Sequence, residues 1–227
     1  QEAAEIERIL ARLSDLARSP REVLQSKFYL LGRLDLVYAK AAFSRTLQAL
    51  EPEIVEETLI YLAQARHPLR LLRMGAAAVT PMQIELGREH NTVIISGPNA
   101  GGKTVALKTV GLLVLMARSG LHIPASPLSQ IGSIDRVFAV IGDQQSIEAD
   151  LSTFSSHLLS LKEIDEQAGR QSLVLVDEIG AGTDPEEGMA LATALLKKLT
   201  VAGALSMVTT HHSVLKTFAY QNDQTAN

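Results

Sequence analysis

Residues 97 to 104 read Gly97-Pro98-Asn99-Ala100-Gly101-Gly102-Lys103-Thr104. The apolar run Val93-Ile94-Ile95 precedes this stretch, and residues 105–117 follow it with a helical pattern. Glycines at this spacing let consecutive backbone N–H groups turn towards one anion, and the positive end of the following helix points at the same charge. The stretch therefore predicts a phosphate-binding loop between a strand and a helix.

The loop offers two kinds of phosphate contact. The backbone from Gly97 to Val105 is expected to surround the phosphates of ATP or ADP. Lys103 would add a cation for the β- and γ-phosphates, and the Thr104 hydroxyl would bind Mg²⁺. The competing interpretation is a glycine-rich turn that binds no ligand. We favour the binding loop because the motif is complete and stands between a strand and a helix.

Two carboxylates end a second apolar run, Leu173-Val174-Leu175-Val176. Four apolar residues in sequence are typical of a buried parallel strand. Asp177 at its end is expected to bind Mg²⁺, and Glu178 to orient and deprotonate the attacking water. Acidic residues also end strands at ordinary protein surfaces. The loop at residues 97–104 favours the catalytic interpretation because it requires such a partner.

A histidine pair follows a third apolar run, in Thr209-Thr210-His211-His212. A single histidine after a strand is commonly a loop or capping residue. Together with the two preceding motifs, however, we expect His211 to contact the γ-phosphate and His212 to be structural.

Composition restricts the class of protein. The 227 residues are 46% hydrophobic, carry a net charge of −4 and include no cysteine. Disulfide scaffolds, thiolate catalysis and cysteine-based zinc sites are thereby excluded, which agrees with a reducing cytoplasm. The acidic balance argues against direct DNA binding by this segment. The apolar stretch Val105 to Ala117 is too short and too charged to span a membrane, so we expect a buried helix.

Hydrophobic periodicity divides the chain into a helical and a layered part. Residues 2–18 and 20–50 have helical patterns, and Ser19 with Glu22 resembles a capping box between them. From residue 82 onward, strands and helices alternate, as in a layered α/β domain. Residues 51–74 are compatible with helix or strand, and the boundary lies between 51 and 80. The expected strands are 82–86, 92–96, 134–140, 172–177 and 204–209, and the expected helices are 103–117, 153–167, 186–199 and 213–219.

In their order along the chain, these motifs resemble the ATPase domain of the MutS family, within the ABC superfamily of P-loop ATPases. Further matches are Arg66-His67-Pro68, Ser152-Thr153-Phe154 and Asp177-Glu178-Ile179-Gly180. The resemblance is strong over 60–220 and weaker before residue 60. It implies an α/β ATPase domain with a mostly parallel sheet over 60–227, lacking its last strands. Residues 1–59 would be the remnant of a helical lever arm.

Within that family the chain resembles the bacterial branch that does not recognise mismatches, MutS-II. The resemblance rests on residues 104–109, 119–125, 142–147 and 180–188. It implies a homodimer in which Ser152 of one subunit completes the nucleotide site of the other, although Ser152 would also serve as the N-cap of helix 153–167. Gln145, or Gln144 beside it, would sense Mg²⁺ or the attacking water. Asp184 would belong to a loop that couples the two sites.

These features together predict Mg-ATP binding and slow hydrolysis in a cytoplasmic homodimer. The alternative is a nucleotide-gated dimerisation module with negligible turnover. The chain is expected to be part of a longer protein, whose clamp on branched DNA or whose ribosome-associated activity the ATPase would drive. Both roles are implied by the resemblance alone, and these residues include no Smr nuclease domain.

One departure from the family pattern concerns the base of the nucleotide. Mismatch-repair relatives place an aromatic residue before the loop strand to stack on adenine, whereas this chain has Ala78-Val79-Thr80-Pro81. The sequence therefore predicts loose discrimination of adenine.

Overall fold

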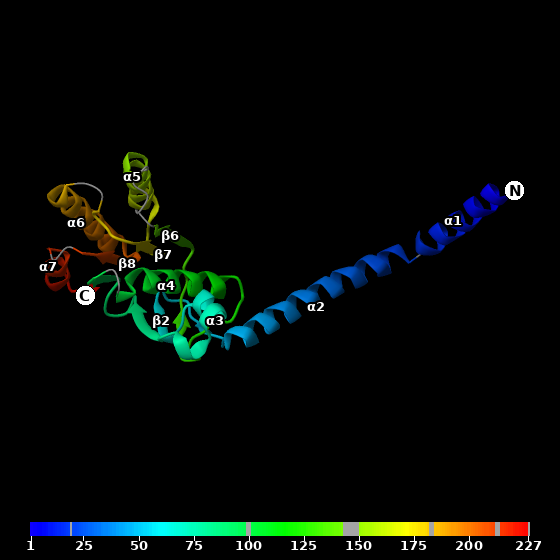
Figure 1. Cartoon of the computed structure of the whole chain (residues 1–227), viewed down its shortest axis with the longest axis horizontal. Helices are drawn as coiled ribbons and strands as arrows, with labels where there is room; N and C mark the ends of the chain where they lie inside the picture. Colours follow the sequence, from blue (N-terminus) through cyan, green and yellow to red (C-terminus); the bar gives the residue numbers. More distant parts are fainter. Residues whose placement is uncertain (19, 99–100, 143–149, 182–183, 212–213, 227) are drawn as a thin grey trace. The chain divides into compact units, whose positions relative to one another are not determined.

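The computed structural model describes residues 1–18, 20–98, 101–142, 150–181, 184–211 and 214–226, with the backbone alone described at 17, 150–156, 214, 216, 220 and 221. The chain forms two compact units, Gln1–Arg45 and Thr46–Asn227 (Figure 1). This boundary lies earlier in the chain than the expected division after residue 59. Residues 46–59 join the second unit because Leu47, Ala49 and Leu59 are buried in it.

The first unit consists of the two helices that the sequence predicts, α1 (Glu2–Arg18) and most of α2 (Arg21–Leu47). Ser19, the proposed cap between them, lies outside the described residues. Apolar side chains of both helices stay exposed in this chain, from Ile6 on α1 to Phe28 and Tyr38 on α2. On α2 they are spread around the helix, and the sequence pattern alone does not distinguish a covered face from a solvated one.

The second unit contains two sheets. A five-stranded sheet has the order β6-β7-β8-β4-β9, and every pairing in it is parallel. A four-stranded mixed sheet has the order β1-β5-β2-β3. The elements of this unit are β1 (Glu53–Ile54), β2 (Ile60–Ala65), α3 (Pro68–Met74), η1 (Ala76–Ala78), β3 (Met82–Leu86), β4 (Thr92–Ser96), α4 (Lys103–Arg118), β5 (Gln130–Ile131), β6 (Arg136–Val140), α5 (Asp150–Gln167), β7 (Ser172–Val176), α6 (Pro185–Ala202), β8 (Leu205–Thr210), α7 (Val214–Gln221) and β9 (Thr225–Ala226).

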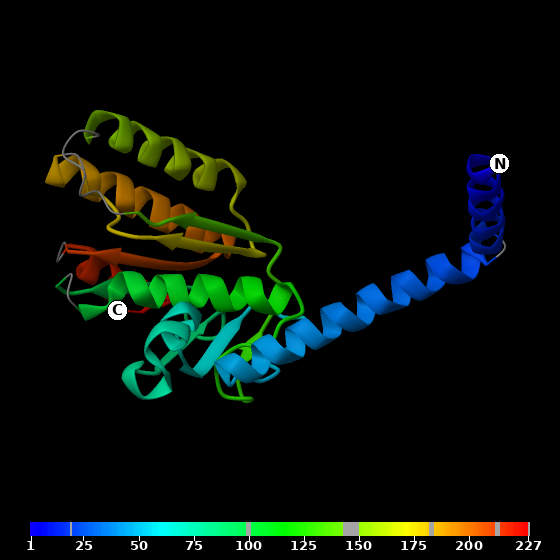
Figure 2. The ribbon, with the colours of Figure 1, turned by 45° about the vertical axis from the view of Figure 1, so that its right-hand side comes forward.

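Strand β7 shows how the layers are built. All five of its residues are buried, and alternate side chains point to opposite faces of the sheet. Leu173 and Leu175 pack into a core with α4 and the four-stranded sheet, whereas Val174 and Val176 pack into a second core beneath α5 and α6. Figure 2 shows α5 and α6 on one face of the five-stranded sheet and α4 on the other. This double coverage explains why the strand is apolar throughout.

The predicted α/β fold with a mostly parallel sheet is confirmed, and each expected strand and helix from residue 82 onward is present within a few residues. The undecided stretch 51–74 contains β1, β2 and α3. The apolar stretch after the loop is α4, which packs between the two sheets. No helix among the described residues is long and apolar enough to cross a bilayer.

Candidate functional site

The loop after β4 leads directly into α4, as the sequence predicts. Gly102 is the N-cap of α4 and has φ +80, a left-handed conformation in which a Cβ would be strained. Helix α4 begins at Lys103, whose side chain is buried although it is charged. Asn99 and Ala100 lie outside the described residues.

The order of the large sheet brings the three predicted motifs together. Strands β7, β8 and β4 are neighbours and run parallel, so their carboxyl ends lie at the same edge of the sheet. The loop follows β4, Asp177 and Glu178 follow β7, and His211 follows β8. Ligands of open parallel sheets bind at this edge.

A chain of polar contacts joins these motifs. Lys103 Nζ donates a hydrogen bond to the carbonyl of Gly97. The same amine lies 3.3 Å from Nε2 and 3.4 Å from Nδ1 of His211. Nε2 of His211 is in turn 3.4 Å from Oε1 of Glu178. The histidine therefore lies between the loop lysine and the predicted catalytic carboxylate.

The two carboxylates at the end of β7 have different surroundings. Asp177 is buried, and its Oδ1 accepts a hydrogen bond from the hydroxyl of Thr209. Glu178 is half-buried, and its backbone has φ +51, an uncommon conformation for a residue with a side chain. Its amide donates to Thr209 Oγ1 at 2.8 Å. Such strained backbone concentrates at functional sites.

Thr209 belongs to this cluster, although the sequence motifs predict no role for it. The pairing of β7 with β8 explains its position. Val176 is opposite Val208, so Asp177, which follows Val176, lies beside Thr209, which follows Val208. A hydroxyl residue at a strand end, beside a carboxylate on the neighbouring strand, is recognisable once the strand order is known.

The donors near the loop fit magnesium bound together with a nucleotide. Thr104 is half-buried in the first turn of α4, and Asp177 keeps a second carboxylate oxygen. Within the described part of the chain, no three His, Asp or Glu side chains form a cluster that could hold a metal. Mg²⁺ commonly binds through one or two protein ligands plus substrate phosphates, so this sparse donor set suits it.

A cavity of about 410 Å³ lies beside the loop. Gly101, Gly102 and Val105 form one wall, and residues 78–82 form another. Arg66 Nε donates to the carbonyl of Val79 at 3.2 Å, which fixes the second wall. The cavity is adjacent to the phosphate loop and has space for a nucleoside. As the sequence predicts, residues 78–82 bring no aromatic ring to it.

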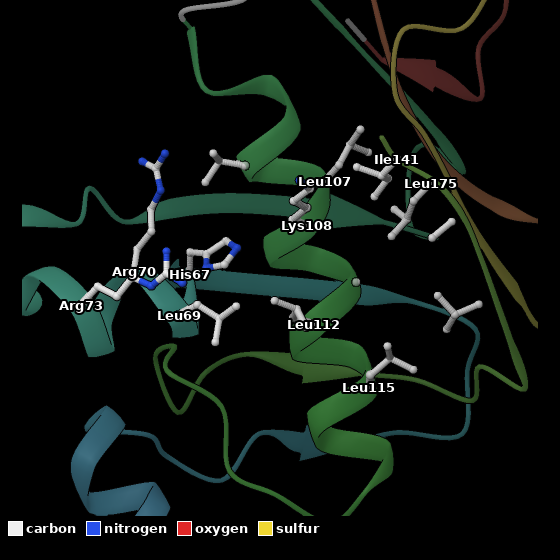
Figure 3. A pocket seen from close by; sticks show the side chains of 14 residues that line it. His67, Leu69, Arg70, Arg73, Leu107, Lys108, Leu112, Leu115, Ile141 and Leu175 are labelled. Atoms are coloured by element: carbon white, nitrogen blue, oxygen red, sulfur yellow. The ribbon is translucent and has the colours of Figure 1, made fainter. Parts of the chain in front are cut away.

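A larger cavity, of about 530 Å³, lies between α3, α4 and β6 (Figure 3). Figure 3 shows Leu107, Leu112 and Leu115 of α4 among its lining residues, with His67 and Arg70 on the α3 side. Its lining contains none of the loop glycines and neither Asp177 nor Glu178. Its size alone therefore does not make it the nucleotide site, although it shares His67, Arg70 and Val105 with the cavity beside the loop.

The remaining predicted site residues lie outside the described residues or belong to the starts of α5 and α6. Gln144, Gln145 and His212 lie outside the described residues. Helix α5 begins at Asp150, so Ser152 is in its first turn and the N-cap interpretation is wrong. Asp184 is the N-cap of α6, where its carboxylate accepts from the amides of Glu186 and Glu187 at 2.9 and 3.4 Å.

The parallel sheet and the arrangement of loop, carboxylates and histidine define a P-loop ATPase domain. A sequence profile of the family described as MutS domain V matches residues 93–227. The chain therefore belongs to the MutS family, and residues 93–227 match that family's ATPase domain.

Curated relatives match the whole chain. Among them are proteins named Endonuclease MutS2 from Caldicellulosiruptor bescii, 48% identical over 227 residues, and from Pelotomaculum thermopropionicum, 49% identical over 226 residues. A third, from a Geobacillus species, is 46% identical over 227 residues. The chain spans 28% of the length of each. The predicted resemblance to the MutS-II branch is confirmed.

Proposed function

We propose that this chain binds Mg-ATP and hydrolyses it slowly, in a composite site that two copies share. The observation that carries the proposal is the contact chain from Lys103 through His211 to Glu178. It joins the phosphate-binding loop to a carboxylate that is positioned to activate water. A loop that only binds nucleotide has no need of the last two residues.

Each residue of the cluster has a distinct role in this proposal. Lys103 transfers its hydrogen bond from the carbonyl of Gly97 to the β- and γ-phosphates. Glu178 accepts a proton from the attacking water, and His211 donates to the γ-phosphate from beside it. Thr104 and Asp177 would hold Mg²⁺, which neutralises charge on the transferred phosphoryl group.

The nucleoside would occupy the cavity of about 410 Å³ beside the loop. Aliphatic side chains such as Val79 and Met82 line it and offer burial for a purine ring rather than stacking. We therefore infer that ATP affinity rests mainly on the phosphates and that other purine nucleotides compete with it effectively.

The composite nature of the site is testable by mixing two inactive variants. Lys103→Ala removes the phosphate cation, and Ser152→Ala removes the hydroxyl proposed to act across the interface. In a mixed dimer, the intact loop of one subunit would meet the intact Ser152 of the other. Random exchange makes about half the dimers mixed, so about a quarter of wild-type activity should return if the sites act independently. No recovery after confirmed subunit exchange would mean that Ser152 acts within its own chain.

The second candidate function, a dimerisation switch with negligible turnover, predicts the same nucleotide binding. Single-turnover hydrolysis separates the two. Product formation that depends on Glu178 supports the ATPase. Stable ATP-bound dimers without product support the switch.

For the longer protein, we propose that this ATPase drives a clamp on branched DNA in the cytoplasm. The relatives' name, Endonuclease MutS2, agrees with a role on nucleic acid. The net charge of −4 argues against direct DNA contacts within this segment. A ribosome-associated role is the other possibility, and it predicts co-sedimentation of the full-length protein with ribosomes rather than retention on branched DNA.

A further inference from the structure

Thr209 contacts three consecutive residues of the turn that follows β7. Its hydroxyl donates to Oδ1 of Asp177 and accepts from the amide of Glu178. Its backbone carbonyl accepts from the amide of Ile179 at 2.9 Å. The threonine is fully buried. One buried residue is thus bonded to the carboxylate of Asp177 and to the backbone amide of Glu178.

These contacts have a fixed direction. The Glu178 amide can only donate, so Thr209 Oγ1 must accept from it and has its own proton left to donate. That proton goes to Oδ1 of Asp177. Among the contacts of the described residues, the remaining lone pairs of the Asp177 carboxylate, Oδ2 above all, are then left for a metal ion. Hydrogen bonds that run in one direction also polarise one another.

The same hydroxyl supports an unfavourable backbone conformation. Glu178 has φ +51, and residues with side chains adopt this region only where their surroundings hold them there. The amide of Glu178 and that of Ile179 are both bonded to Thr209. Thr209 therefore connects β8 to the turn from which the Glu178 side chain reaches His211.

We propose that Thr209 is a positioning residue that couples the magnesium ligand to the water-activating carboxylate. The proposal rests on the ATPase function proposed above. Thr209 touches neither the nucleotide nor the water in it. Its hydroxyl orients Asp177 for Mg²⁺ and holds the backbone of Glu178 in the conformation that catalysis needs.

Three substitutions distinguish the hydroxyl from the packing of the side chain. Thr209→Val keeps the shape and removes the hydroxyl, Thr209→Ser keeps the hydroxyl and removes the methyl group, and Thr209→Ala removes both. We expect the valine and alanine variants to hydrolyse ATP roughly ten- to a hundredfold more slowly, because a buried bond to a charged group is lost. The serine variant should stay within about threefold of wild type. The reverse order, with valine active and serine impaired, would assign Thr209 a packing role only.

The dependence of ATPase activity on Mg²⁺ concentration provides a second test. Loss of packing alone would not change this dependence while leaving nucleotide affinity without Mg²⁺ unchanged. In Thr209→Val, the Mg²⁺ concentration for half-maximal activity should rise by about tenfold. Nucleotide affinity measured in EDTA should stay within about twofold, which also shows that the variant is folded. Thr200→Val is the matched control, because its hydroxyl donates to the carbonyl of Leu196 within α6. It should leave both values unchanged.

Hydrogen exchange of the Glu178 amide tests the proposal without nucleotide. We expect exchange at least about tenfold faster in Thr209→Val than in wild type, and near the wild-type rate in Thr209→Ser. Unchanged exchange in Thr209→Val overturns the positioning role even if the protein is an ATPase. A different result would be faster exchange in Thr209→Val together with a wild-type protein that binds no Mg-ATP. It would support the contacts of Thr209 with the turn and overturn the proposed function instead.

Discussion

The amine of Lys103 lies 3.3 Å from Nε2 of His211, although 108 positions separate the two residues in the chain. Their proximity follows from the pairing of β4 with β8, which run parallel and end at the same edge. Lys103 is at the start of the helix after the first strand, and His211 follows the second. The lysine is therefore held where a triphosphate on the loop would meet both side chains.

Replacing Lys103 by alanine should abolish measurable Mg-ATP binding. The variant loses the buried amine that would contact the β- and γ-phosphates, and we expect affinity to fall by about a hundredfold or more. Isothermal calorimetry measures the change. Lys108→Ala is the control, because Lys108 is an exposed lysine on the same helix and should bind as wild type does. Equal affinities in the two variants would contradict the assignment of the loop.

Replacing Glu178 by glutamine should preserve binding and slow the chemical step by about a hundredfold or more, the usual effect of losing a general base. The same change should accumulate ATP-bound dimers. Single-turnover hydrolysis is the measurement, with Glu186→Gln on the exposed first turn of α6 as the control. If hydrolysis is unchanged in Glu178→Gln, His211 becomes the better candidate for the base.

A side chain at Gly180, in the turn after Glu178, should destabilise the folded chain. This residue has φ +84, and a Cβ would lie 2.8 Å from the carbonyl oxygen of Gly188. Gly180→Ala should lower the free energy of unfolding by about 1–3 kcal/mol. Gly169→Ala is the control, because a Cβ there meets no atom within 4 Å. Equal unfolding midpoints in urea for the two variants would argue against strain at Gly180.

The residues proposed to bind phosphate could be identified from the sequence because their chemistry depends on local order. A glycine loop between a strand and a helix, and carboxylates at the end of an apolar strand, are patterns of neighbouring residues. The parallel sheet could also be predicted from the sequence, since strands such as β7 are apolar on both faces. Because the strands of this sheet run parallel, the residues that follow them, among them Asp177 and His211, lie at one edge of the sheet.

The parts that escaped prediction depend on contacts between distant residues. Thr209 acquires its role only because β8 lies beside β7. Strands β1 and β5 have two residues each, too few for a period of alternation to be detected. The sequence predicts that α5 begins at residue 153, with Ser152 before it, because a serine at the start of a helical run is a common N-cap. In the structure the helix begins at Asp150.

The free energy of unfolding should decrease as the pH is lowered through the range in which histidines take up protons. His67 is buried, with its Nδ1 unpartnered among the described residues, and burial together with the charge of Arg70 lowers its pKa below the ordinary value of 6.5. Burial also lowers the pKa of His157, whose Nε2 is buried without a described partner.

The direction of this change in stability depends on which state, folded or unfolded, takes up protons first as the pH is lowered. The unfolded chain protonates these histidines near pH 6.5, whereas the folded chain resists protonation until the pH is lower. Their contribution is therefore complete above that value and is lost as the pH decreases towards the lowered pKa values. Urea unfolding at about pH 7.5 and about pH 5.5 should show a smaller free energy at the lower pH. The double variant His67→Phe, His157→Phe should show a smaller difference between the two conditions, whatever its absolute stability. An equal difference in wild type and variant would mean that other groups, such as the carboxylates, cause the pH dependence.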